Sequence, residues 1–335
     1  MKNGVQSQDV LSVPDMHGQA QMELVPPHLE HGVLIGTGTA PSHHGELLQG
    51  VFEDDGVLHR GLVTLPCSLF ASNAVVRLSP WQPELTVTPA WKTKALGAAR
   101  TTLEALGLSD YGGELELRSD VAVGRGLGSS TSDVTAAIFA VLSAAGRTLS
   151  PERIARIAVA AEAATDPLVY SDRMVLFAHR EGLVIEDFHR PVPPLAVVGF
   201  SATETEIDTL ALPRARYNAW EIECFRALRG LMRRAVARGD HRELGRIATA
   251  SARINQRFLP VPRFDRVLEI AEETEALGVQ VAHSGTVAAL LFAPHQPGLE
   301  QRTALAARRL AELRITDHWR YTAGSDSHVP YAHQS

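Results

Sequence analysis

A glycine–serine loop between a strand and an apolar helix constrains this chain more than any other feature. Residues 119–139 read SDVAVGRGLGSSTSDVTAAIF, with three glycines within five residues, Gly124, Gly126 and Gly128. Glycine lets the backbone adopt positive φ angles and approach a ligand closely. Ser129 and the hydroxyl residues after it are suited to begin a helix. The unpaired N–H groups and the positive dipole end of that helix favour an anion, so the segment predicts a phosphate-binding loop.

The loop differs from the two common nucleotide fingerprints, because it lacks the Lys of GxxxxGK[ST] and the glycine spacing of GxGxxG. Residues 126–130, GLGSS, match the core of PxxxGLGSSAA, the second motif of the GHMP kinase superfamily, which the chain therefore resembles. The leading Pro is absent, and Thr131 and Ser132 replace the two alanines. The alternative is a Ser-rich loop that caps a structural helix.

Two more segments resemble motifs of this superfamily, in the expected order. Residues 41–50, PSHHGELLQG, follow a strand predicted at 32–40 and resemble the first motif, in the form APxxxGELLQG that is typical of the L-threonine kinases of cobamide synthesis. Residues 283–286, HSGT, lie about 150 residues after the glycine loop and resemble the third motif of the same branch. An ordinary β-turn with an exposed acid and a tight turn are the respective alternatives.

The resemblance implies an α+β GHMP kinase fold, in which ATP lies between a domain like ribosomal S5 domain 2 and a ferredoxin-like domain. We expect a mobile extension over residues 1–30, an ATP-binding domain over 31–190 and a C-terminal domain over 191–335. Hydrophobic periodicity and breaker residues predict helices at 92–106, 151–162, 214–239, 240–258, 263–278 and 297–314. They predict one or two strands at 61–78, further strands at 85–88, 113–119, 174–177, 183–185 and 195–200, a strand or helix at 287–292, and a frayed end from 321.

Composition excludes several classes of function. The net charge of −6, without a Lys/Arg cluster, argues against nucleic-acid binding. No apolar run reaches 18 residues, and the N-terminus lacks a signal pattern, so we expect no membrane association. Cys67 and Cys224 lie far apart and indicate reduced thiols in a cytoplasmic protein. His43 and His44 are adjacent, and HxH and HxxxH are absent, which argues against a zinc enzyme.

The three motifs together imply an ATP-dependent phosphotransferase that acts on a small hydroxyl compound. Its phosphates need a cradle of N–H groups and Mg²⁺. Mg²⁺ needs a carboxylate, which in the family lies on the next helix, and Glu162 is the only acid in the second half of that helix. Ser130 is the first choice for the metal-binding hydroxyl and Ser129 the second. The predicted phosphate cradle comprises Gly124, Arg125, Gly126, Leu127, Gly128, Ser129, Ser130 and Thr131.

The group that takes the acceptor proton is open between two residues. Asp166 follows Thr165 as in the threonine-kinase branch, whereas Asp172 has the spacing from Glu162 that mevalonate kinases show. Each could also be a turn or cap acid. Phosphoryl transfer can proceed by positioning alone, so a base is not obligatory.

For the acceptor, we expect Glu46 to pair with an amino group. His43 and His44 would contact its carboxylate or serve only as turn residues. His283 and Ser284 are expected to pack on the phosphate loop, and Ser284 and Gly285 to border the substrate. The specific expectation is an L-threonine kinase that uses ATP and Mg²⁺ to make O-phospho-L-threonine. Another acceptor such as homoserine, and a non-catalytic ligand-binding relative, are the alternatives, and a homodimer stays open.

Overall fold

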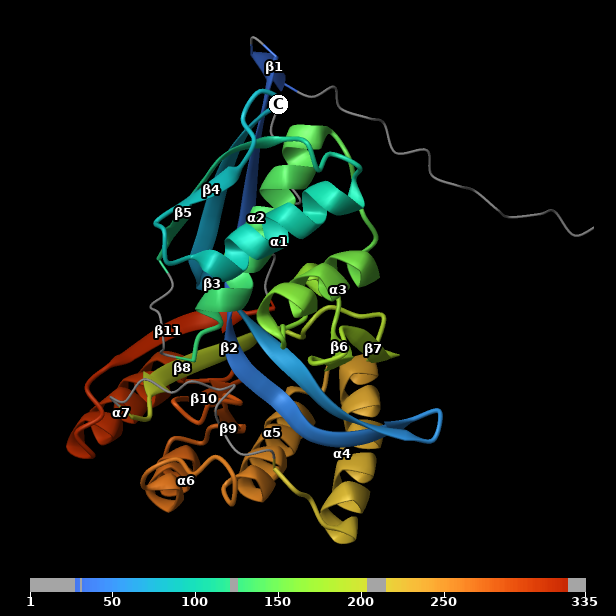
Figure 1. Ribbon diagram of the computed structural model, residues 1–335. Helices are drawn as coiled ribbons and strands as arrows, with labels where there is room; N and C mark the ends of the chain where they lie inside the picture. The colour runs from blue at the N-terminus through green and yellow to red at the C-terminus, as the bar shows by residue number, and fades with distance from the viewer. Residues whose placement is uncertain (1–27, 31, 121–125, 204–214, 325–335) are drawn as a thin grey trace, which may run out of the picture.

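The computed structural model describes residues 28–30, 32–120, 126–203 and 215–324, and within them one sheet runs through the whole molecule (Figure 1). The main path of the sheet is β11 (His318–Ala323), β8 (Leu195–Ser201), β10 (Val287–Phe292), β9 (Gly278–Val281), β2 (Val33–Asp54), β3 (Val57–Ser79), β5 (Gly112–Ser119) and β4 (Leu85–Thr88). Three strands pair beside this path, namely β1 (His28–Glu30) with β2, β6 (Val175–Ala178) with β3, and β7 (Leu183–Asp187) with β6.

The long antiparallel hairpin of β2 and β3 forms the centre of the sheet. The two strands join at Asp55 and Gly56, which both have positive φ, as a tight hairpin turn requires. The register shifts repeatedly between Pro41 and Leu48, so the first motif lies inside a bulged strand. The predicted end of the strand near residue 40, followed by a turn, is therefore wrong: bulges provide the local bend without ending the pairing.

In the N-terminal half, a layer of helices covers one face of the sheet. The layer consists of α1 (Thr93–Ala105), α2 (Ser129–Ala145) and α3 (Pro151–Glu162) (Figure 1). Helix α2 approaches β2 so closely that a Cβ atom at Gly36 or Gly38 would lie 2.2 Å from helix backbone atoms. Helix α3 begins as predicted, since the Ser150 hydroxyl accepts the Arg153 N–H and Pro151 occupies the first turn.

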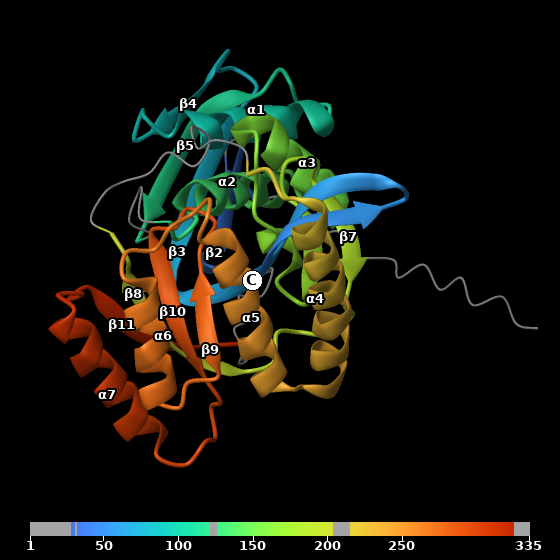
Figure 2. The ribbon, with the colours of Figure 1, turned by 90° about the horizontal axis from the view of Figure 1, so that it is seen from below.

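The C-terminal half has ferredoxin-like topology. Its four strands lie in the order β11-β8-β10-β9, which is 4-1-3-2 in chain order. Helices α4 (Ala219–Arg238), α5 (His241–Asn255) and α6 (Phe264–Glu273) connect β8 to β9, and α7 (Leu299–Glu312) connects β10 to β11. Figure 2 shows α5, α6 and α7 beside these strands. This half of the predicted fold is confirmed.

Two predicted boundaries in this half are wrong. Residues 321–323 are not frayed, because they continue β11 along β8. The helix predicted to reach residue 278 ends at Glu273, and Gly278 instead begins β9. The residues predicted at 287–292 as strand or helix form β10, and those from 325 to 335 lie outside the described part of the chain, as do 1–27 of the predicted extension.

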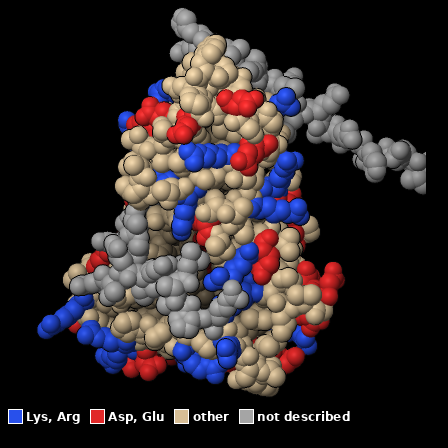
Figure 3. Space-filling view, in the orientation of Figure 1, with Lys and Arg blue, Asp and Glu red and all other residues tan. Residues whose placement is uncertain are grey.

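The two halves meet along the hairpin. Glu46 of β2 pairs with Val281 of β9, which continues the sheet across the junction. Beyond the junction, Phe52 packs on Phe225 of α4, with their ring centroids 5.8 Å apart. The domain boundary at residues 190 and 191 stays a prediction. No described helix is both long and apolar enough to cross a membrane. Figure 3 shows basic and acidic side chains interspersed over one face.

Candidate active site

The glycine loop is the point at which all three sequence motifs meet. Gly126 and Gly128 have φ angles of +76° and +72°. A Cβ atom at Gly128 would lie 2.1 Å from Cδ2 of His43, in the first motif. One at Gly126 would lie 2.3 Å from the hydroxyl oxygen of Ser284 and 2.2 Å from that of Thr286, in the third motif. Both glycines are therefore required by close packing as well as by backbone conformation.

The loop is tied to β2 and leads directly into α2. The Ser132 hydroxyl donates to the Pro41 carbonyl at 2.8 Å, and the His43 N–H donates to the Leu127 carbonyl at 3.4 Å. Gly128 occupies the N-cap position of α2 and has no side chain with which to cap it. The first turn of the helix therefore keeps the N–H groups that can bind an anion. Gly124 and Arg125, also predicted for the cradle, lie outside the described residues.

Half-buried Ser130, in the first turn of α2, pairs with buried Glu162, at the end of α3. The Ser130 hydroxyl donates to Oε2 of Glu162 at 2.7 Å. Glu162 is 5% exposed, and its Oε1 atom has no hydrogen-bond partner among the described residues. Burial raises the pKa of Glu162 to about 7, against the opposing hydrogen bond from Ser130. A buried carboxylate oxygen without a partner, beside a hydroxyl, is a donor set that fits Mg²⁺.

Asp166 lies beside this pair, at the neighbouring residue Thr131, and contacts His43. The Asp166 Oδ2 atom is 2.8 Å from Nε2 of His43 and 3.4 Å from the Thr131 hydroxyl. Burial alone would raise the pKa of Asp166, but His43 and then His283 outweigh burial and lower it. The Gly45 N–H donates to Nδ1 of His43 at 3.1 Å, which assigns the ring proton of neutral His43 to Nε2, toward Asp166.

Glu46, which is buried, and His283, which is half-buried, form a second acid–histidine pair. Oε1 of Glu46 lies 2.7 Å from Nδ1 of His283, and Oε2 of Glu46 has no hydrogen-bond partner among the described residues. Burial lowers the pKa of His283, but Glu46 and Asp166 outweigh burial and raise it to about 9. His283 is therefore protonated at neutral pH. The titratable and charged groups that face its ring are Glu46, Asp166, Arg180, His43 and His179.

The structure does not bring two of the predicted residues into this group. Asp172 is a surface residue, and its side chain pairs with Arg173 at 2.8 Å. His44 points away from His43, because successive side chains of a strand face opposite sides. Its Nδ1 atom lies 3.0 Å from the Gln280 Oε1 atom, and burial lowers its pKa to about 4, so His44 is a neutral core residue. Of the two aspartates, the geometry therefore favours Asp166.

The third motif packs on the loop. The hydroxyl groups of Ser284 and Thr286 lie 2.7 Å apart, and both face Gly126. Gly285 has a φ angle of +73°, which turns the chain into β10. A further histidine, His179, was not predicted. It lies half-buried beside His283, with the ring centroids 6.3 Å apart, and desolvation lowers its pKa to about 3. Its position follows β6 and carries no recognisable sequence signal.

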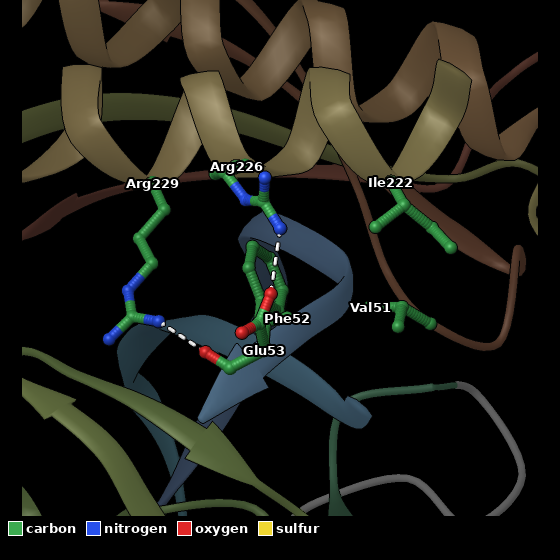
Figure 4. A pocket seen from close by; sticks show the side chains of 6 residues that line it. All are labelled: Val51, Phe52, Glu53, Ile222, Arg226 and Arg229. Atoms are coloured by element: carbon green, nitrogen blue, oxygen red, sulfur yellow. Dashed lines mark hydrogen bonds and ion pairs between the residues drawn. The ribbon is translucent and has the colours of Figure 1, made fainter. Parts of the chain in front are cut away.

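A cavity of about 430 Å³ lies away from this group, between the tip of β2 and α4 (Figure 4). Arg226 donates to the Glu53 carboxylate at 2.7 Å, and Arg229 donates to the Glu53 carbonyl at 2.8 Å. Arg229 also pairs with Glu186. Because both arginines are already engaged within the protein, this cavity offers no charge for a ligand.

Comparison with known proteins agrees with this geometry. Residues 93–169 match the GHMP kinase N-terminal domain, and residues 232–311 match the GHMP kinase C-terminal domain. Among solved structures, a homoserine kinase from Cytophaga hutchinsonii superposes with a TM-score of 0.67 at 17% identity, covering 88% of this chain and 96% of that one. A mevalonate kinase from L. major, in complex with R-mevalonate, gives a TM-score of 0.59 at 16% identity, covering 88% and 96%. The chain therefore contains both an N-terminal and a C-terminal GHMP kinase domain, and the predicted fold is confirmed.

Two relatives with higher sequence identity are both described as L-threonine kinases. The chain is 28% identical over 290 residues to an L-threonine kinase of Salmonella typhimurium, covering 85% of this chain and 91% of the relative. It is 27% identical over 287 residues to an L-threonine kinase of Citrobacter freundii, covering 85% and 94%. The predicted class of enzyme, a kinase, is confirmed, and kinases of this family use ATP.

Proposed function

We propose that the chain transfers the γ-phosphoryl group of ATP to the hydroxyl of L-threonine and releases O-phospho-L-threonine and ADP. One observation carries the proposal: the two acids meet neighbouring residues in the first turn of α2, because Ser130 bonds to Glu162 and Thr131 bonds to Asp166. The relatives described as L-threonine kinases and the GELLQG and HSGT segments support threonine as the acceptor. The free cysteines, Cys67 and Cys224, support a reducing, cytoplasmic setting.

The glycine loop and the Ser130–Glu162 pair have the groups that ATP and Mg²⁺ need. The N–H groups of residues 126–131 would bind the phosphates, and Ser130 and Glu162 would bind Mg²⁺. When bound, Mg²⁺ supplies positive charge that stabilises the phosphates during transfer. Glu162 must lose its proton to bind the metal, and the approach of the cation favours that loss.

Asp166 is the proposed base. Its low pKa keeps it ionised, and it would accept the proton from the threonine hydroxyl as the new oxygen–phosphorus bond forms and the bond to ADP breaks. His43 would act as a positioning residue, because its Nε2 proton faces the aspartate while the Gly45 N–H fixes the ring. After transfer, the protonated Asp166 would return its proton to water.

The test is steady-state ADP release with Mg-ATP against L-threonine, L-serine, L-homoserine and simple polyols. We expect L-threonine to give the highest kcat/KM. Asp166→Asn should lower kcat by about 10²- to 10⁴-fold, whereas the matched surface variant Asp172→Asn should leave it unchanged. Activity on homoserine alone would overturn the choice of acceptor. Turnover that survives in Glu162→Gln, or no turnover of any acceptor by the wild type, would overturn the kinase mechanism.

A further inference from the structure

A second cavity, of about 80 Å³, borders the candidate active site. His179 and His283, which both face Asp166, form part of its wall, and Arg60, Arg180 and Tyr217 form other parts. A cavity needs about 10–15 Å³ to hold one water, so this space admits a small polar group and is too small for a nucleotide.

The wall of this cavity carries positive charge. Arg60 and Arg180 line it together with His283, and none of the described lining residues is acidic. Glu46, the carboxylate that pairs with His283, lies behind that ring and not on the wall. A cavity whose charged lining groups are all cationic selects an anion, and guanidinium groups match a carboxylate through parallel hydrogen bonds.

We propose that this cavity binds the carboxylate of the amino-acid acceptor through Arg180, with Arg60 as a second contact. The inference rests on the proposed function, which it deepens by naming the residues that select an α-amino acid over a simple amino alcohol. The sequence left two interpretations of His43 and His44, as carboxylate contacts or as turn residues. In the structure His44 faces Gln280 in the core and His43 faces Asp166.

The surroundings of the two arginines support this assignment. Nε of Arg180 is buried and has no hydrogen-bond partner among the described residues, and a buried donor without a partner is destabilising unless a ligand accepts its hydrogen bond. Arg60 is oriented by β3, and its Nη2 atom donates to the Ala215 carbonyl at 2.6 Å. Arg180 directly follows His179 after β6, so the backbone that carries the guanidinium also carries a wall residue nearer Asp166.

The order of groups across the site matches the acceptor. The two arginines line the cavity together with His179 and His283, and Asp166, which both histidines face, lies beyond them at the glycine loop. An α-amino acid with a β-hydroxyl likewise carries its carboxylate and its hydroxyl on neighbouring carbons. The carboxylate would therefore face the arginines, and the hydroxyl would face Asp166.

The experiment compares L-threonine with (R)-1-amino-2-propanol, which is the same molecule without the carboxylate. We expect Arg180→Leu to lower kcat/KM for L-threonine by about 10- to 100-fold, mostly through KM, and to leave kcat/KM for the amino alcohol unchanged. Arg180→Lys should show a smaller loss than Arg180→Leu, because lysine keeps the positive charge but cannot form the two parallel hydrogen bonds of a guanidinium group. The matched control is Arg226→Gln at the other cavity, which should change neither substrate.

Binding measured by calorimetry without ATP separates the two proposals. If Arg180→Leu weakens L-threonine binding while the wild type fails to phosphorylate any acceptor, the carboxylate site stands and the proposed function fails. If the wild type phosphorylates L-threonine and Arg180→Leu retains its kcat/KM and affinity, the carboxylate site fails and the proposed function stands. Equal losses for both substrates in a folded Arg180→Leu variant would also overturn the carboxylate assignment.

Discussion

Replacing Gly128 by alanine tests whether the first motif and the glycine loop depend on each other. Two penalties coincide at Gly128: a φ angle of +72°, and a position for the new Cβ atom only 2.1 Å from Cδ2 of the buried His43 ring. Two other glycines separate these effects. Gly107 has the same φ of +72° with open space around it, and Gly97 has open space without a positive φ.

The magnitudes follow from these three environments. Gly97→Ala in α1 should stabilise the protein by about 0.5–1 kcal/mol, because alanine is the better helix former. Gly107→Ala should cost about 1–2 kcal/mol for the left-handed conformation, less about 0.4–1 kcal/mol gained from a more restricted unfolded chain. Gly128→Ala adds the steric overlap with His43, which costs about 1–3 kcal/mol, so the total loss should be about 1–5 kcal/mol.

Urea unfolding gives the three free energies, and ADP release gives the kinetic effect. To admit the new methyl group, His43 must move, which disturbs its 2.8 Å contact with Asp166 and should lower kcat in Gly128→Ala. Gly97→Ala and Gly107→Ala should keep the wild-type kcat. If Gly128→Ala unfolds at the same urea concentration as Gly107→Ala and retains full activity, the proposed coupling between loop and first motif is incorrect.

Three further predictions concern charges buried in the N-terminal half and at the junction. The first concerns His283, whose pKa is raised by Glu46 only in the folded state. Between pH 6.5 and about 9 the free energy of unfolding should therefore fall by up to about 1.4 kcal/mol per pH unit. Urea unfolding at several pH values should show a smaller dependence on pH in His283→Gln. Lys92→Met should destabilise the protein by about 3–5 kcal/mol, because it leaves Asp133 buried and unpaired, and adding Asp133→Leu should restore most of the loss in thermal unfolding. Mg-ATP should raise the melting temperature of the wild type, whereas chelation of Mg²⁺ or Glu162→Gln should remove most of that increase in a thermal-shift assay.

The sequence was informative wherever the determining interactions are local. Breakers and caps located α1 and α3, and the small residues of the glycine loop predicted a strand, loop and helix in that order. Glu162 could be singled out because it is the only acid in the second half of its helix. These features depend on hydrogen bonds and φ angles within a few residues, and the residue types at those positions constrain both directly.

The parts of the site that the sequence did not predict depend on contacts between residues far apart in the chain. Asp166 and Asp172 lie in the same turn and are alike in sequence, and only the packing of His43 against Asp166 separates them. His179 and Arg180 reach the site because β6 pairs with β3 through Phe177 and Leu62, a register that no local pattern specifies. The continuation of β2 through the first motif was also unpredictable, because a run with Pro41 and Gly45 has the composition of a turn.

The bulged strand explains why one short motif serves both halves of the protein. His43 faces the glycine loop and Asp166, whereas its neighbour His44 packs among Gln280, Trp319 and Tyr321 of the ferredoxin-like half. Had the strand ended at a turn, neither half would be fixed relative to the other by this segment. The bulge instead lets a continuous hydrogen-bonded strand carry one histidine that orients the reacting carboxylate and another that anchors it to the opposite half. Histidines that the sequence presents as a pair therefore act on opposite sides of the same backbone.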